Sequence, residues 1–272
     1  RAANDRDIRL DNLIKIIQLI GLVIYDTDQR SHHRKCSKTV RNMKPIDMTG
    51  EKSAILLIYT GGTIGMKVDP TVQALRPFNF SQLLEEVPEL GKFAYRIDSY
   101  TFDPLIDSSD VEPSMWLSLV SLIEEKYDEY DGFVILHGTD TMGYSASALS
   151  FMIEGLTKPV IFTGSQLPIG TPRTDGKENL ISAVEIAAAK DCEGHAVVPE
   201  VCIYFDNILM RGNRATKINS DHFRAFRSPN CPPLAEAGIN IIYNSTLIRK
   251  PASWSARPLF HKDIDTRVSI LK

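Results

Sequence analysis

The sequence of 272 residues contains little cysteine and no excess of positive charge. The four cysteines are scattered along the chain without CxxC spacing; they are Cys36, Cys192, Cys202 and Cys231. This pattern argues against a structural zinc site and a disulfide framework, and it favours a reducing, cytoplasmic setting. Because the net charge of −3 at pH 7 provides no basic surface, we expect no nucleic-acid partner.

Apolar runs long enough to span a bilayer are also missing from the sequence. The nearest candidate, Leu13–Tyr25, is short, contains Lys15 and is not followed by a clear small-residue cleavage site. We therefore expect no membrane insertion, and a signal sequence is the alternative interpretation of this stretch.

Several motifs that would identify other enzyme classes are absent. The sequence has no GxxxxGK[ST], and no GxGxxG follows its first apolar run, which argues against a phosphate-binding loop. It also has no GxSxG that could supply a serine nucleophile beside His137. We therefore interpret His137 as a packed histidine at the end of a strand.

Residues 1–50 differ in composition from the rest of the chain. Their basic, polar tract Gln29–Lys44 could be a targeting or nucleic-acid arm, but we favour a poorly ordered or non-native N-terminal extension. His32 and His33 lie close to Cys36, yet no fourth ligand has suitable spacing. We therefore expect no metal, and we expect no organic cofactor.

From Ser53 onward, short apolar runs alternate with segments of helical spacing. Uninterrupted apolar runs are typical of strands buried on both faces of a parallel sheet. Strands are expected at Ala54–Tyr59, Phe133–Leu136, Pro159–Thr163 and Val201–Phe205, and helices at Tyr144–Glu154 and Asn179–Lys190. The alternation predicts the α/β fold class, with a doubly wound, mostly parallel sheet.

Four further elements are expected around this framework. Arg96–Phe102 is predicted as an edge strand, and Pro70–Asn79 as a loop over the site. Ser109 or Asp110 is expected to cap a helix that runs to about Tyr127. Ile239–Tyr243 is a candidate for a further short strand.

The sequence predicts the following domains. Residues 51–245 form the catalytic domain, 246–265 a linker, and 266–272 the start of a second, smaller α/β domain that is cut short. Thr266–Leu271 is expected to begin a strand of that domain.

Two of the predicted strands end in Gly-Thr elements, Gly62-Thr63 and Gly138-Thr139-Asp140. The carboxyl ends of central strands are where open α/β sheets bind ligands. A threonine hydroxyl needs a group that removes its proton, and Lys217 beside Asp140 could relay that proton. The alternative interpretation, which the spacing leaves open, is a tight turn with capping threonines.

These elements resemble the two signature motifs of the bacterial-type L-asparaginase family, particularly its cytosolic type I branch. The motifs are Thr60–Gly65 (TGGTIG) and His137–Met142 (HGTDTM). Four supporting segments also resemble the family: Leu105–Asp110, Lys158–Gln166, Arg173–Leu180 and Arg211–Lys217. The resemblance covers about residues 53–250.

The resemblance implies a function and a set of site residues. It implies hydrolysis of L-asparagine to L-aspartate and ammonia through a threonine nucleophile and an acyl-enzyme. Thr63 would be the nucleophile, whereas Thr139, Asp140 and Lys217 would handle protons. Thr60 would be part of the turn. The implied substrate-binding residues are Gly62, Asp107, Ser108, Ser109, Gly138, Thr139 and Asp140, with Asp140 on the substrate ammonium and Ser108 on its carboxylate.

The sequence departs from the family on the loop Lys67–Phe78, which has no tyrosine where many members carry a mobile one. In some type I relatives a tyrosine of the C-terminal domain serves instead. The family also implies a homodimer or homotetramer when that domain is present.

Two alternatives to the L-asparaginase function stay open. The protein could be a glutaminase or an amidotransferase subunit of the same fold, or it could be an inactive, incomplete gene product.

Overall fold

The computed structural model describes residues 53–69, 74–77, 83 and 85–268. The predictions made for residues 1–50 lie outside the described residues. No helix within the described part of the chain is long and apolar enough to cross a membrane.

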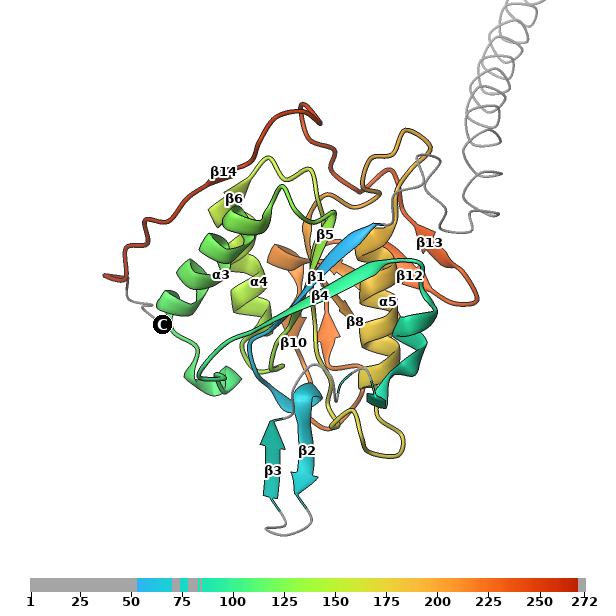
Figure 1. Ribbon diagram of the computed structural model, residues 1–272. Helices are drawn as coiled ribbons and strands as arrows, with labels where there is room; N and C mark the ends of the chain where they lie inside the picture. The colour runs from blue at the N-terminus through green and yellow to red at the C-terminus, as the bar shows by residue number, and fades with distance from the viewer. Residues whose placement is uncertain (1–52, 70–73, 78–82, 84, 269–272) are drawn as a thin grey trace, which may run out of the picture. The chain divides into compact units, whose positions relative to one another are not determined.

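The fold is built on a mixed sheet in the order β13-β12-β9-β8-β7-β5-β1-β4 (Figure 1). The five strands from β8 to β4 run parallel to one another, whereas β9, β12 and β13 are added antiparallel at one side. The α/β class and the mostly parallel sheet are therefore confirmed. The strands are β1 (Ala54–Tyr59), β4 (Arg96–Thr101), β5 (Gly132–Leu136), β7 (Val160–Thr163), β8 (Val201–Phe205), β9 (Ile208–Arg211), β12 (Ala235–Ala237) and β13 (Ile241–Tyr243).

The central strands read as uninterrupted apolar runs because both of their faces are buried. Successive side chains of a strand point to opposite faces. In β1, Leu56 and Ile58 therefore enter one core, and Ile55 and Leu57 enter the other. Strands β5, β7 and β8 divide their side chains between the same two cores.

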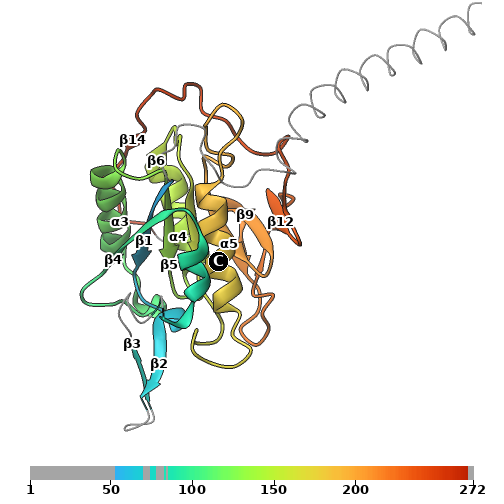
Figure 2. The ribbon, with the colours of Figure 1, turned by 45° about the vertical axis from the view of Figure 1, so that its right-hand side comes forward.

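Helices cover both faces of the sheet, as the doubly wound prediction requires. Helices α3 (Pro113–Lys126) and α4 (Met142–Met152) pack on one face, and α5 (Gly176–Ala188) packs on the other (Figures 1 and 2). The predicted cap of the first of these helices is wrong. Glu112 precedes α3, and Pro113 occupies its first turn, where the missing N–H of proline costs no hydrogen bond.

The residues expected to cap α3 form a separate short turn. Ser108–Asp110 make a 3₁₀ helix, η3, and the side chain of Asp107 accepts a hydrogen bond from the backbone N–H of Ser109 at 2.9 Å. This local turn therefore uses the polar side chains before α3 begins.

The segment predicted as a loop over the site contains a strand. After the 3₁₀ turn η1 (Thr63–Gly65), β2 (Met66–Asp69) pairs antiparallel with β3 (Ala74–Pro77). The loop prediction is thus wrong at 74–77. The hairpin extends beyond the end of the sheet at which β1 terminates (Figure 1).

The chain after β13 packs against the helical layer and runs back over it. The short strand β14 (Leu259–Phe260) pairs antiparallel with β6 (Ile153–Glu154) at the end of α4. The ring of Trp254 stacks on His195 at 4.3 Å between ring centroids. Residues 266–268 form no strand, and the rest of the predicted Thr266–Leu271 strand lies outside the described residues.

The remaining elements are η2 (Pro88–Lys92), η4 (Gly212–Arg214), and β10 (Thr216–Lys217) paired with β11 (Phe226–Arg227).

The topology separates the loops that follow β1 and β5. From β1 the chain joins β4 on one side of β1, whereas from β5 it continues to β7 and β8 on the other side. Neighbouring strands whose connections diverge leave a crevice at their carboxyl ends, where such sheets bind ligands. The two Gly-Thr elements follow these two strands.

Candidate active site

The turn after β1 is fastened to the end of β5. Thr60 donates its backbone N–H and its hydroxyl to the carbonyl oxygen of Leu136, each at 3.0 Å. Its own carbonyl accepts the backbone N–H of Ile106 at 2.9 Å. Thr60 is therefore part of the turn, as predicted.

Glycine is required where the two motifs meet. Gly62 has a φ of 91°, a left-handed conformation that favours glycine, and a Cβ on it would lie 2.5 Å from the Cα of Gly138. This close approach of two backbones brings the start of η1, Thr63, beside the end of β5.

Lys217 joins the second motif from a third part of the chain. Its Nζ donates to Thr139 Oγ1 at 2.8 Å and to Asp140 Oδ1 at 2.8 Å. The Lys217 side chain is only 16% exposed, because β10 lies next to α4. A lysine held between a hydroxyl and a carboxylate can exchange protons with that hydroxyl.

Asp140 is held on its other side by Ser108, whose hydroxyl donates to Asp140 Oδ2 at 3.1 Å. The hydrogen bond from Lys217, and then that from Ser108, lower the pKa of Asp140, although partial burial opposes the shift. Asp140 is therefore ionised at neutral pH. The η3 turn is itself tied to this motif, because the Thr141 hydroxyl donates to the Ser108 carbonyl at 2.6 Å.

The structure brings most of the expected site residues together. Gly62, Gly138, Ser108, Thr139, Asp140 and Lys217 are linked by the contacts above. Asp107 and Ser109 are not part of this network in the structure. The Ser109 hydroxyl and N–H both bond to Asp107 Oδ1.

Sequence reasoning missed Gln166, which follows the third buried strand. Thr139 Oγ1 lies 3.4 Å from Gln166 Oε1, and Gln166 Nε2 donates to the carbonyls of Ser220 and His222 at 3.0 Å. Gln166 thus connects Thr139 to the segment after Lys217. The only signal was its place at the end of a segment that resembles the family.

Asp175 holds the backbone of Gln166 in place. It accepts the N–H of Gln166 and that of Leu167, at 3.0–3.1 Å. It also accepts from Asn179, the side chain that bonds the Gly164 carbonyl. Burial nonetheless raises the pKa of Asp175.

His137 is packed in the core, as predicted. It is 1% exposed, its Nδ1 bonds to the Gly138 carbonyl at 2.7 Å, and its ring lies edge-on to Phe162. Burial lowers the pKa of His137 to about 4, so the ring is neutral at pH 7. A neutral ring that bonds a carbonyl donates from Nδ1.

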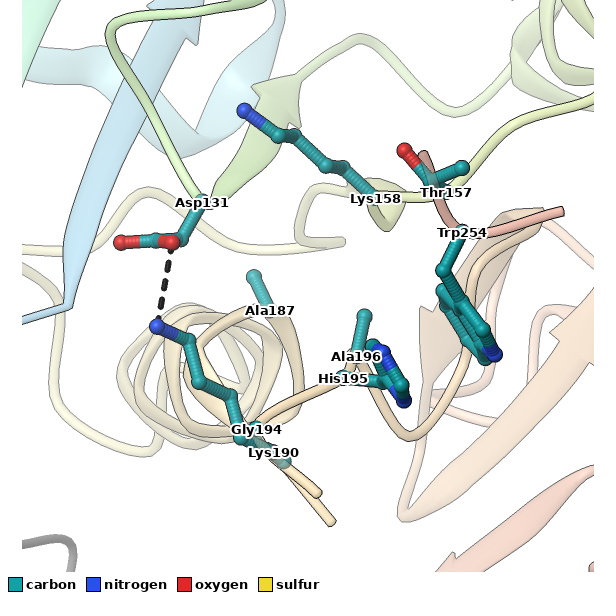
Figure 3. Close-up of a pocket in the computed structure, with 10 residues that line it drawn as sticks. Asp131, Thr157, Lys158, Ala187, Lys190, Gly194, His195, Ala196 and Trp254 are labelled. Atoms are coloured by element: carbon teal, nitrogen blue, oxygen red, sulfur yellow. Dashed lines mark ion pairs between the residues drawn. The ribbon is translucent and has the colours of Figure 1, made fainter. Parts of the chain in front are cut away.

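The described residues also form a pocket away from these motifs (Figure 3). It has a volume of about 140 Å³ and lies where β5 and β7 begin. Lys190 forms an ion pair there with Asp131 at 3.1 Å. The described part of the chain holds no group of three or more His, Cys, Asp or Glu side chains that could bind a metal.

The chain belongs to the asparaginase family, since residues 54–249 match the family model described as "Asparaginase, N-terminal". It is 48% identical over 194 residues to L-asparaginase 1 of Escherichia coli K12, which covers 70% of this chain and 55% of that protein. It is 38% identical over 246 residues to the 60 kDa lysophospholipase of Mus musculus, covering 82% of this chain and 42% of that protein.

Solved structures agree with this assignment. The crystal structure of L-asparaginase I from Vibrio cholerae has a TM-score of 0.68 and 44% identity, covering 78% of this chain and 61% of that one. The resemblance to the type I branch is thereby confirmed. The chain spans about half the length of the curated relatives it matches.

Proposed function

We propose that the protein hydrolyses L-asparagine to L-aspartate and ammonia. The observation that carries the proposal is the bridge from Lys217 to Thr139 and Asp140, at the strand ends where Gly62 meets Gly138. Family membership and identity to a protein named L-asparaginase 1 support the choice of substrate.

In the proposed reaction, Thr63 Oγ attacks the carbon of the substrate's side-chain amide. The C–N bond breaks, the amide nitrogen takes up the proton lost by the Thr63 hydroxyl and leaves as ammonia, and an aspartyl ester remains on Thr63. Water then attacks the ester carbonyl, which releases L-aspartate and restores the Thr63 hydroxyl. Thr139 and Lys217 would pass the protons between these groups.

A zwitterionic substrate needs an acceptor for its ammonium group and donors for its carboxylate. We propose that Asp140 accepts from the ammonium and that the Ser108 hydroxyl, which donates to Asp140 Oδ2 in the free protein, turns to donate its one proton to the substrate carboxylate. Gly62, Gly138, Asp107 and Ser109 complete the proposed substrate site. The lowered pKa of Asp140 supports its part, because a carboxylate is required there.

The test is ammonia release from L-asparagine by the full-length protein and by Thr63→Ala and Lys217→Ala. We expect both substitutions to abolish most of the activity. Rates like those of the wild type in either variant would contradict the mechanism.

The substrate preference is measured separately. The ratio of kcat/KM for L-asparagine to that for L-glutamine should exceed about ten, since a single additional methylene changes binding by this order. A ratio below one would support a glutaminase or an amidotransferase subunit. Activity together with a cooperative melt would exclude an inactive gene product.

We also propose a cytoplasmic homodimer or homotetramer, supported by the resemblance to the type I branch. Light scattering on the purified protein tests the oligomer, and a monomeric mass would contradict it. The proposed domain limits, 51–245 with a linker at 246–265 and a further domain from 266, can be tested by limited proteolysis.

A further inference from the structure

The turn that carries Thr63 contains three glycines, and a different group packs against each one. A Cβ on Gly61 would overlap the backbone of Ile106, and one on Gly62 would overlap the backbone of Gly138. A Cβ on Gly65 would instead overlap the ring of Tyr59. The first two contacts are between backbones, whereas the third is made by a side chain of the turn's own strand.

Tyr59 is the last residue of β1, and its side chain folds forward over the turn. Its hydroxyl donates to the Gly62 carbonyl at 3.4 Å, while its ring occupies the space that a side chain on Gly65 would need. The residue is 7% exposed. Tyr59 therefore contacts the residue immediately before Thr63 and the last residue of η1.

The hydroxyl remains a hydrogen-bond donor under ordinary conditions. Burial raises the pKa of Tyr59 well above its usual value, so the phenol does not ionise at physiological pH. The Met66 N–H, which donates to the Thr63 carbonyl, closes the same turn from its other end. Thr63 thus lies inside a turn that is fixed at Gly62, at Gly65 and at Met66.

We propose that Tyr59 is a positioning residue for Thr63, clamping the Gly62–Gly65 turn so that the hydroxyl is held in the geometry of attack. The inference rests on the proposed function, because the clamp matters to catalysis only if Thr63 is the nucleophile. The rate of a positioned reaction depends steeply on such geometry.

Loosening the clamp should lower kcat more than it raises KM. The groups proposed to bind the substrate's charged ends, Asp140 and Ser108, are held by Lys217 and Thr141 and do not touch Tyr59 in the contacts described above. Binding of the substrate's charged ends would therefore survive a change at Tyr59. Of the proposed substrate site, the Tyr59 hydroxyl bonds to Gly62, so KM should change less than kcat.

The first test is Tyr59→Phe, which removes only the hydroxyl. We expect kcat for L-asparagine to fall about twofold to fivefold, the low end for one hydrogen bond because the contact of 3.4 Å is long, with KM changed by a smaller factor. The matched control is Tyr127→Phe. Tyr127 is also buried, and its hydroxyl bonds to Thr157 Oγ1 at 2.9 Å, outside the proposed active site.

The second test exploits the packing between Tyr59 and Gly65. Gly65→Ala should displace the ring and lower kcat, because the added methyl group has no room. Adding Tyr59→Leu shortens the side chain and should recover part of kcat. A double variant less active than both single variants would contradict the direct contact.

Hydrogen exchange separates this inference from the proposed function. The Met66 amide should exchange faster in Tyr59→Phe than in Tyr127→Phe, whatever reaction the protein catalyses. The clamp would be overturned if the Met66 amide exchanged equally fast in Tyr59→Phe and Tyr127→Phe and the two variants had equal kcat. It would also be overturned if exchange were faster in Tyr59→Phe while its kcat stayed at the wild-type value. A wild-type protein without amide hydrolysis would overturn the proposed function alone, and the exchange rates would still decide the clamp.

Discussion

Lys217 donates from Nζ to the hydroxyl oxygen of Thr139 at 2.8 Å, although 78 positions separate the two residues in the sequence. The same Nζ lies 2.8 Å from Asp140 Oδ1. Thr139 follows the end of β5, and Lys217 reaches it from β10, which lies next to α4. One lysine side chain therefore joins a hydroxyl and a carboxylate that both follow β5.

Removing the Lys217 charge should abolish most catalysis without unfolding the protein. Lys217→Met keeps the length of the side chain but removes its donors. We expect kcat/KM for L-asparagine to fall by about a hundredfold to ten-thousandfold, the usual contribution of a proton-transfer group. Ammonia release measures the loss. The pKa of Asp140, followed by NMR, should rise because its largest stabilising partner is gone.

Lys190→Met is the matched control for this experiment. Lys190 also forms an ion pair, with Asp131, but it lies in the pocket where β5 and β7 begin. We expect its kcat/KM to stay within about twofold of the wild type, because Lys190 lies away from the two Gly-Thr elements and partly exposed ion pairs contribute little stability. Similar losses in both lysine variants would contradict a specific role for Lys217.

Ser108 should matter chiefly for substrate binding. Ser108→Ala removes the hydrogen bond to Asp140 Oδ2 and the proposed donor to the substrate carboxylate. Hydrogen bonds to charged groups contribute about 1.5–3 kcal/mol, so KM should rise at least tenfold. Steady-state kinetics measure KM, and Ser118→Ala, which loses only a bond to Ser114 within α3, is the control. An unchanged KM in Ser108→Ala would exclude the proposed contact.

The contact between Gly62 and Gly138 predicts a strong effect on stability. Gly62→Ala adds a methyl group 2.5 Å from the Gly138 backbone at a φ of 91°. We expect a loss of about 2–5 kcal/mol in the free energy of unfolding, from overpacking together with backbone strain. Gly91→Ala, where a Cβ would meet nothing within 4 Å, should change stability by less than about 1 kcal/mol. Denaturant titration compares the two, and equal losses would refute the close approach.

His137 should make stability depend on pH below neutrality. Its pKa is about 6.5 when unfolded and is lowered by burial to about 4 in the folded protein. Above pH 6.5 neither state binds the proton, whereas between pH 6.5 and 4 only the unfolded state does. The free energy of unfolding should therefore fall by about 3 kcal/mol across that interval, at 1.36 kcal/mol for each pKa unit.

His137→Asn removes this dependence while costing stability at every pH. The difference in unfolding free energy between wild type and variant should shrink as the pH falls from 7 to 4. Asp140 does not affect this comparison. Its pKa is lowered in the folded protein, so its contribution to the free energy of unfolding is lost only as the pH falls below the ordinary aspartate pKa of 3.8. Parallel pH profiles for the two proteins would show that His137 is not the group responsible.

The buried strands could be predicted from the sequence because burial on both faces leaves a local signature. The run Ala54–Tyr59 forms β1 with the expected bounds, and Val201–Phe205 forms β8. In contrast, β9 and β12 were not predicted. They are short antiparallel additions whose pairing depends on the path of the chain after β8.

The residues of the candidate site also divide into those that the sequence predicts and those that it does not. Thr139, Asp140 and Lys217 could be selected from motifs, but the contacts of Gln166 could not. Its amide reaches Ser220 and His222, more than 50 residues away, and nothing in the local sequence specifies that meeting. The turn at Ser108–Asp110 was likewise unpredictable, because the side chain of Asp107 accepts the Ser109 N–H and forms a local turn of its own ahead of α3.

The most direct test of the central claim is to trap the acyl-enzyme. The full-length protein is mixed with L-asparagine, quenched in acid within the first turnovers, digested, and analysed by mass spectrometry. The account predicts an aspartyl group esterified to Thr63, which disappears in Thr63→Ala together with ammonia release. An aspartyl adduct on another residue, or rapid ammonia release from Thr63→Ala, would contradict it.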